Sequence, residues 1–315
     1  GVTVIYPYLL VLLDKFKKGI LSGEEVKEIL QTIESYLFRR IIVGLPSHGY
    51  SRIFVSIEDN VRKRQDTKDG NYVDIVNSLF LADGKNRRFP HDNEFLENLM
   101  SRNIYEELLP AYRKYLFSRL ENGDSKEQTN VIARLENTQY TIEHIMPLTL
   151  NSQWIDALGE NYEEIHETWL HTLPNLTLTG YNSKYSNRSF EEKMTMKDGF
   201  RDSPLRLNKY IGRCETWTEK ELRERKLILE KLATELWKRP VTSYKEQHEE
   251  IVSCSIEDVR NFRKREKLYS FVLFGKEQVN SVWKSMFVDV FEILREYDPI
   301  RFQTLLQKEK PEWIY

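Results

Sequence analysis

The sequence has little cysteine and no apolar run long enough to cross a membrane. Cys214 and Cys254 are its two cysteines, too few for a disulfide framework or a four-thiolate zinc site, and this usage suits a reducing compartment. The apolar stretch near the start, residues 4–13, is about ten residues long, whereas a membrane span needs about 20. No basic segment precedes it, as a signal peptide would require. We therefore expect a cytoplasmic protein without membrane contact.

The sequence also lacks a strong charge of one sign and a phosphate-binding glycine loop. Its 47 basic and 49 acidic residues give a formal net charge of −2, so any nucleic-acid site must be local. The 13 glycines are scattered. With 40% apolar and 30% charged residues in 315, the composition predicts a globular protein of two or three domains.

The patterning predicts a mainly α protein with a small α+β part. Residues 1–138 have helical periodicity throughout and form a predicted helical domain. Ser22 and Glu25 make a capping box before one of its helices, 26–43. Further helices are predicted at 52–64, 72–81, 93–100 and 105–120.

The pattern changes after residue 138. Residues 139–145 and 176–179 predict two short strands, with a helix at 153–170 between them. Helices are predicted to open near 181 and to span 218–237. We assign 139–240 to a second domain.

Residues 241–315 predict a small C-terminal α+β module. A strand at 269–274 is followed by a turn at Gly275 and Lys276, and a second strand is predicted to begin at Val279. Helices are predicted at 282–297 and 299–307. DNA binding is one candidate role for this module.

Glu143 and His144 stand together at the end of the first predicted strand, before Pro147. An imidazole can accept a proton from water, and a carboxylate can hold a hard divalent metal ion. The same pair also suits a core histidine beside an exposed glutamate, so two residues alone do not decide between these readings.

Three further polar residues follow at suggestive positions. Asn175 heads the second predicted strand, and its amide could orient the loop that holds His144. Asn182 lies where a helix opens and could turn an amide oxygen toward a metal, and Lys184 could meet a phosphate. Each alone also suits an ordinary turn or helix cap.

Together these segments resemble a known family. The segments 142–147, 174–178 and 182–187 look like an HNH (His-Me finger) nuclease, and more narrowly like the nuclease domain of GmrSD-type modification-dependent restriction proteins. Residues 36–40 and 86–90 are similar to the helical region of that family, and Phe190 to Lys193 also fits. The fold implied is a helical domain, an embedded ββα-metal nuclease and a C-terminal module.

The resemblance implies a metal-dependent DNA endonuclease of a restriction or anti-phage system that acts on modified or foreign DNA. By similarity His144 is the general base and Asn175 orients it. Glu143 and Asn182 would hold Mg²⁺, with Mn²⁺ as an alternative, and Lys184 would contact the phosphate during catalysis. Phosphodiester hydrolysis needs such a base and such charge neutralisation.

The sequence departs from the family pattern at two points. Pro174 stands where the family usually has glycine, and proline removes an amide donor. The Asp-Gly-Gln-Gln-Arg-type motif of the family's N-terminal NTPase domain is absent from the sequence, which predicts a fragment whose partner is that domain. The oligomeric state stays open.

DNA binding needs a local basic surface. Residues 201–239 hold eleven basic and seven acidic residues, and residues 260–267 are also mostly basic. A solvated charged face would have the same composition. The predicted DNA contacts are Lys184, Asn187, Arg188, Arg263, Lys264 and Arg265.

Two other classes of function stay open. One is an inactive DNA- or protein-binding scaffold with an HNH-like fold, and the other is a helical interaction module. A zinc-protease reading of His166 and His171 is set aside, because their i, i+5 spacing turns the two rings away from one another on a helix.

Overall fold

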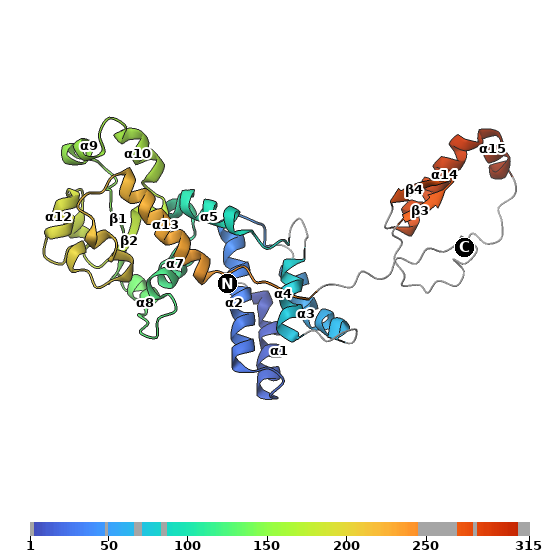
Figure 1. Ribbon diagram of the computed structural model, residues 1–315, viewed down its shortest axis with the longest axis horizontal. Helices are drawn as coiled ribbons and strands as arrows, with labels where there is room; N and C mark the ends of the chain where they lie inside the picture. Colours follow the sequence, from blue (N-terminus) through green and yellow to red (C-terminus); the bar gives the residue numbers. More distant parts are fainter. Residues whose placement is uncertain are drawn as a thin grey trace. The chain divides into compact units, whose positions relative to one another are not determined.

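The computed structural model describes residues 3–47, 50–65, 71–82, 87–244, 270–279 and 282–307. The chain divides into two compact units, Gly1–Lys245 and Glu246–Tyr315. Each unit is described separately, and the ribbon is drawn in Figure 1. In the described part, no helix is both long and apolar enough to cross a membrane.

Helices fill the first unit up to the first strand, as the sequence predicts. They are η1 (Thr3–Ile5), α1 (Tyr6–Lys17), α2 (Gly23–Ile42), α3 (Tyr50–Gln65), α4 (Tyr72–Leu81), α5 (Asp92–Ser101), α6 (Ile104–Glu107), α7 (Pro110–Asn122) and α8 (Val131–Glu136). The capping box of Ser22 and Glu25 begins α2. Gly44, with φ of +74°, follows the helix end, where a left-handed residue stops the helix.

Two helices predicted as continuous are each divided in two. The predicted helix 105–120 is α6 and α7, because Pro110 has no amide hydrogen and begins a new helix. The predicted helix 153–170 is α9 (Ser152–Leu158) and α10 (Tyr162–Trp169), which are separated at Gly159 with φ of +76°.

The predicted strands form a two-stranded antiparallel sheet. Strand β1 (Thr141–His144) pairs with β2 (Leu176–Thr179), and His144 lies opposite Leu176 in the register. The elements that follow β2 are α11 (Asn182–Tyr185), α12 (Phe190–Thr195), η3 (Phe200–Asp202), η4 (Arg206–Asn208), η5 (Ile211–Arg213) and α13 (Glu219–Leu236). The turn η2 (Leu173–Asn175) comes directly before β2.

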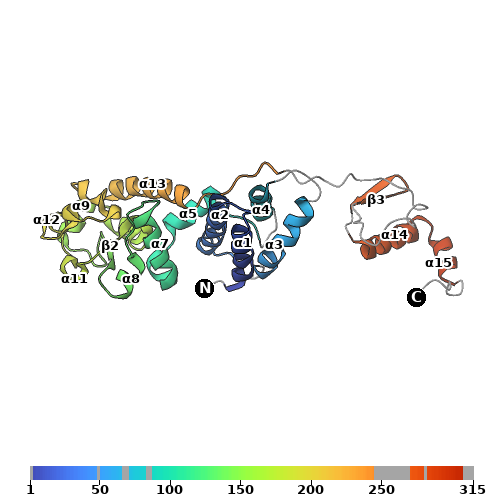
Figure 2. The same ribbon diagram turned by 90° about the horizontal axis from the view of Figure 1, so that it is seen from below.

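Three clusters of buried side chains stabilise this unit. One lies among α1 to α4, one among α9, α10, α12 and the start of α13, and the third contains residues of α2, α5, α7, β2 and α13. In the third cluster Trp237 stacks on Phe38 with ring centroids 4.4 Å apart. Figures 1 and 2 show α13 lying beside α5 and α7. The core is therefore continuous across residue 138, and a domain boundary there stays a prediction.

The second unit has a hairpin and two helices in its described part. Strands β3 (Ser270–Leu273) and β4 (Lys276–Val279) pair antiparallel, and α14 (Trp283–Tyr297) and α15 (Pro299–Gln307) follow. The strand predicted to begin at Val279 instead ends there, because the turn is at Phe274 and Gly275, both with positive φ. The predicted accessory module, 241–315, overlaps this unit.

Candidate functional site

Strand pairing brings the predicted site residues into one region. The amide of Ile145 donates to the carbonyl of Asn175 at 2.9 Å, just beyond the end of the β1–β2 ladder. After β2 the chain turns into α11, and the side-chain amide nitrogen of Asn182 donates to the carbonyl of Ile142 at 3.2 Å. Segments 30 to 40 residues apart are thus joined around the end of β1 by direct hydrogen bonds.

His144 packs against the rings of Tyr105 and His171. Its Nε2 is 3.1 Å from Nδ1 of His171, and the ring of Tyr105 meets its ring edge-to-face at a centroid distance of 4.5 Å. Burial, followed by the charges of His171, Lys193 and His166, lowers the pKa of His144 to about 4. The imidazole is therefore neutral near pH 7, which is the state a general base needs.

The side chain of Glu143 points to the opposite side of β1 from that of His144, as successive strand residues do. Its Oε1 accepts from Nζ of Lys193 at 2.7 Å, and the same ammonium donates to the carbonyls of His144 and Ile145 at 2.9 and 3.1 Å. Burial raises the pKa of Glu143 and lowers the pKa of Lys193, and each partner offsets part of the other's shift. Lys193 thus holds the backbone at His144 and directly after it.

Asn175 is fully buried and uses both ends of its amide. Its Oδ1 accepts from the amide of Met146 at 2.8 Å, and its Nδ2 donates to the carbonyls of Met146 and Leu170 at 2.9 and 3.0 Å. These bonds hold the loop directly after His144, which is the contact that the predicted orienting role requires. The role itself stays a prediction.

Pro174 fits its place before β2, and its carbonyl accepts a hydrogen bond. It lies in η2, and its oxygen accepts from the guanidinium of the buried Arg225 at 2.8 Å. The proline ring suits the start of a helical turn, where an amide donor is not used. The departure from the family's glycine therefore leaves the Asn175 bonds in place.

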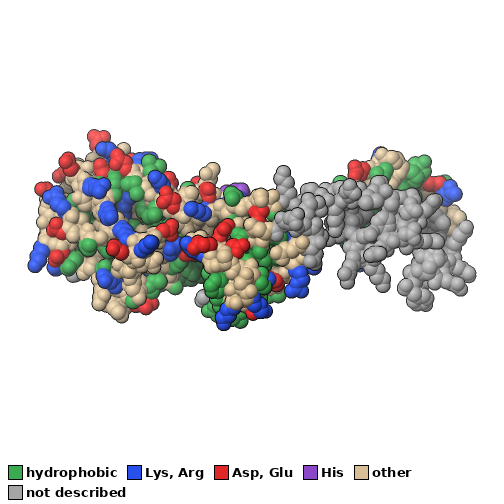
Figure 3. Space-filling view, turned by 60° about the horizontal axis from the view of Figure 1, so that its bottom comes forward, with side chains coloured by type: hydrophobic (Ala, Val, Ile, Leu, Met, Phe, Trp, Pro, Cys, Tyr) green, Lys and Arg blue, Asp and Glu red, His purple; other side chains and the backbone are tan. Residues whose placement is uncertain are grey.

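The structure gathers several of the predicted DNA contacts along one groove. This groove has a volume of about 900 Å³, and its lining includes Lys184, Asn187, Arg188 and Lys197. Nζ of Lys184 lies 3.6 Å from Oδ2 of Asp198, and Nη1 of Arg188 lies 3.8 Å from Oε1 of Glu192. Both basic side chains therefore have acidic neighbours. On the face drawn in Figure 3, basic and acidic side chains are interspersed.

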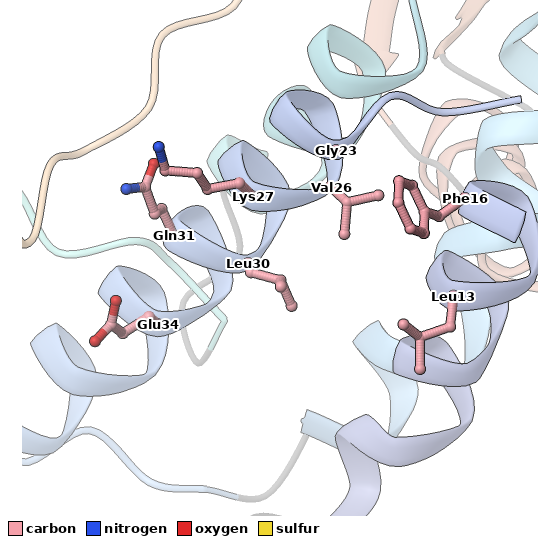
Figure 4. Close-up of a pocket in the computed structure, with 8 residues that line it drawn as sticks. All are labelled: Leu13, Phe16, Gly23, Val26, Lys27, Leu30, Gln31 and Glu34. Atoms are coloured by element: carbon pink, nitrogen blue, oxygen red, sulfur yellow. The ribbon is translucent and has the colours of Figure 1, made fainter. Parts of the chain in front are cut away.

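The remaining predicted DNA contacts, Arg263, Lys264 and Arg265, lie outside the described residues. A second groove, of about 550 Å³, lies between α1 and α2 and is lined mainly by apolar side chains such as Leu13, Phe16, Val26 and Leu30 (Figure 4). His144 and Glu143 line neither groove.

Sequence reasoning missed two residues that contact His144. The spacing of His171 from His166 predicts no site, yet His171 is the hydrogen-bond partner of the His144 imidazole. Nε2 of His166 instead lies 2.9 Å from the carbonyl of Pro147. Tyr105 comes from the helical region, far from His144 in sequence. Lys193 lies in a segment that fits the family, but the sequence predicts no role for it.

Two side-chain oxygens near β1 are available as ligands for a hard cation held by few protein ligands. Within the described ranges there is no group of three or more His, Cys, Asp or Glu side chains placed to hold a metal ion. Within the same described ranges, neither Oε2 of Glu143 nor Oδ1 of Asn182 has a hydrogen-bond partner. Both are oxygen donors, and Mg²⁺ commonly binds through one or two such groups and several waters.

Comparisons with known proteins give one family match. The family model described as GmrSD restriction endonucleases, C-terminal domain, matches residues 89–253, more than half of the chain. The match contains both strands, α11, α12 and α13, together with the α5–α7 segment that supplies Tyr105. A search of curated proteins found no match.

Proposed function

The chain belongs to the GmrSD restriction endonuclease family through the C-terminal domain of that family, and we propose that it is a metal-dependent DNA endonuclease of the HNH type. The proposed nuclease lies within residues 139–240. Its role would be restriction of modified or foreign DNA in the cytoplasm, together with an NTPase domain of the same system.

The observation that best supports this proposal is the environment of His144. It lies at the end of β1 in an antiparallel pair, its loop is fixed by Asn175, and α11 follows β2. This order of two strands and a helix, with Glu143 before the histidine and Asn182 opening the helix, is the one that the ββα resemblance implies.

In the proposed reaction, His144 takes a proton from water. The water oxygen then forms a bond to phosphorus, the bond from phosphorus to the leaving oxygen breaks, and that oxygen takes a proton from solvent. Asn175 and Lys193 act by fixing the backbone on which His144 stands. Neutral imidazole is available because burial holds the pKa of His144 well below neutrality.

Glu143 and Asn182 would hold the cation, Mg²⁺ or Mn²⁺, through carboxylate and amide oxygens. When bound, the cation would neutralise charge on the phosphate and the leaving oxygen. Lys184, Asn187 and Arg188 line the groove along which we place the DNA backbone, since phosphate contacts give most of the non-specific affinity.

Plasmid cleavage tests the proposal. The wild type, His144→Ala and the matched surface variant His91→Ala are compared with Mg²⁺, with Mn²⁺ and with EDTA, and DNA binding is measured beside them. We expect metal-dependent cleavage by the wild type and His91→Ala, and loss of cleavage but not of binding in His144→Ala. Equal cleavage by all three proteins would refute the role of His144. Binding without cleavage by every protein, on modified phage DNA and with the NTPase domain added, would establish the scaffold alternative instead.

A further inference from the structure

His171 is held rigidly against His144. Its carbonyl accepts hydrogen bonds from the amides of Ile104 and Tyr105, at 3.0 and 3.3 Å, so the first turn of α6 fixes its backbone. Its ring stacks on that of Tyr105, with centroids 5.8 Å apart and planes 16° from parallel. Tyr105 also packs against His144, and one aromatic ring therefore restrains both imidazoles.

The proton positions on these rings follow from their neighbours. Nε2 of His171 lies 3.7 Å from Oε1 of Glu106, which favours a proton on Nε2 and a lone pair on Nδ1. That lone pair faces Nε2 of His144 at 3.1 Å. A hydrogen bond between two facing ring nitrogens needs one proton between them, and with the His171 proton on its Nε2 the donor is His144.

We propose that His171 is a positioning residue that keeps the proton of neutral His144 on Nε2 and leaves Nδ1 as its basic nitrogen. This inference rests on the proposed nuclease function in one respect, because it names Nδ1 as the atom that takes the proton from water. When Nδ1 gains that proton, His144 becomes a cation, and His171 accepts a stronger hydrogen bond from it. His171, which lies beside Glu106, would fix the tautomer of the base His144, as the orienting carboxylate of a catalytic triad does for its histidine.

Two substitutions at position 171 separate the loss of the hydrogen-bond acceptor from the loss of the aromatic ring. His171→Phe keeps a ring against Tyr105 but removes the acceptor, whereas His171→Asn keeps an acceptor oxygen near the position of Nδ1 and removes the ring. The exposed His91 provides a matched control as His91→Phe. Unfolding by urea and the amide NMR spectrum establish that each variant is folded.

The primary measurement is the tautomer of His144, read from nitrogen NMR of the full chain with ¹⁵N-labelled histidine. The His144 signals are assigned by their loss in His144→Gln. We expect the Nε2-protonated form in the wild type, His91→Phe and His171→Asn, and a large Nδ1-protonated fraction in His171→Phe. An unchanged tautomer in folded His171→Phe would overturn the proposal.

Cleavage of DNA supplies the second readout. We expect His171→Phe to lower the rate of single-turnover cleavage by about 10- to 100-fold, as the loss of a hydrogen-bond partner of a site residue commonly does. DNA affinity should not change, and His171→Asn should keep most of the rate. If His171→Phe does not fold, Glu106→Ala serves instead, since its side chain is 62% exposed, and it should lower the Nε2-protonated fraction of His144. A wild type that shows the expected tautomer but does not cleave modified phage DNA with the NTPase domain added would refute the nuclease and leave the role of His171 standing.

Discussion

Lys193 and Glu143 form an ion pair of 2.7 Å whose side chains are 0% and 5% exposed. The pair joins α12 to β1 at the residue before the candidate base. Removing one member of a buried pair leaves the other charged and without a partner, which is costly. The ammonium also satisfies two backbone carbonyls, so its contribution is larger than that of the pair alone.

We expect Lys193→Met to lower the free energy of unfolding by about 3 kcal/mol. Glu143→Gln combined with Lys193→Met should lose less than the two single changes added together, because the double variant leaves no buried charge. Urea unfolding at pH 7 measures all of these values, with the exposed Lys231→Met as control. A Lys193→Met protein as stable as Lys231→Met would show that the pair does not hold β1.

Asn175 provides a second test of the backbone around His144. Asn175→Ala removes the partners of the Met146 amide and of two carbonyls in a site without solvent access. A buried polar group without a partner costs about 1–3 kcal/mol, so we expect a loss of about 3 kcal/mol or more in urea unfolding.

The matched control for Asn175→Ala is Asn161→Ala, at an exposed helix start where the side chain makes no capping bond. Its stability should stay within about 0.5 kcal/mol of the wild type. Similar losses in the two variants would mean that the amide of Asn175 does not fix the loop.

The groove beside α11 predicts a salt-dependent effect on DNA binding. Lys184→Gln and Arg188→Gln should each weaken binding uniformly across sequences and reduce the slope of log affinity against log salt by about 1. The control is Lys18→Gln, since Lys18 is exposed and paired with Asp14 four residues away, much as Arg188 is paired with Glu192. If all three variants have the same slope, the DNA does not follow this groove.

Much of the secondary structure was predictable because its signals are local. The capping box of Ser22, the alternation in 176–179 and the helix 218–237 need only neighbouring residues, and the structure contains each of them. Pro110 and Gly159 are residue types that often end or begin a helix, and the structure divides two helices there. The apolar periodicity continues across both positions and therefore predicts continuous helices.

The site was less predictable because its contacts join distant segments. Spacing indicated His144, Asn175 and Asn182, which the two strands bring together. The partners Tyr105 and His171 depend on how α6 packs against the end of α10, and no local pattern encodes that packing. Glu191, Glu192 and Lys197 make the sequence around Lys193 charged, which is typical of an exposed segment and does not indicate a buried ammonium.

The low pKa of His144 links stability to pH. The folded-state pKa is about 4, whereas an unperturbed histidine titrates near 6.5. Between these values the unfolded chain binds more protons at this residue than the folded protein does, so stability rises with pH in that window and falls as the pH is lowered through it. The contribution is fully present above about pH 6.5 and fully lost below about pH 4.

We therefore expect the wild type to lose about 2 kcal/mol more than His144→Gln between pH 7 and pH 5, because glutamine does not titrate. Urea unfolding at the two pH values measures the difference, and His91→Gln should follow the wild type because His91 is exposed. Equal losses in the wild type and His144→Gln would mean that the imidazole is hydrated and titrates normally. In that case burial would not be the reason that neutral His144 is available as a base.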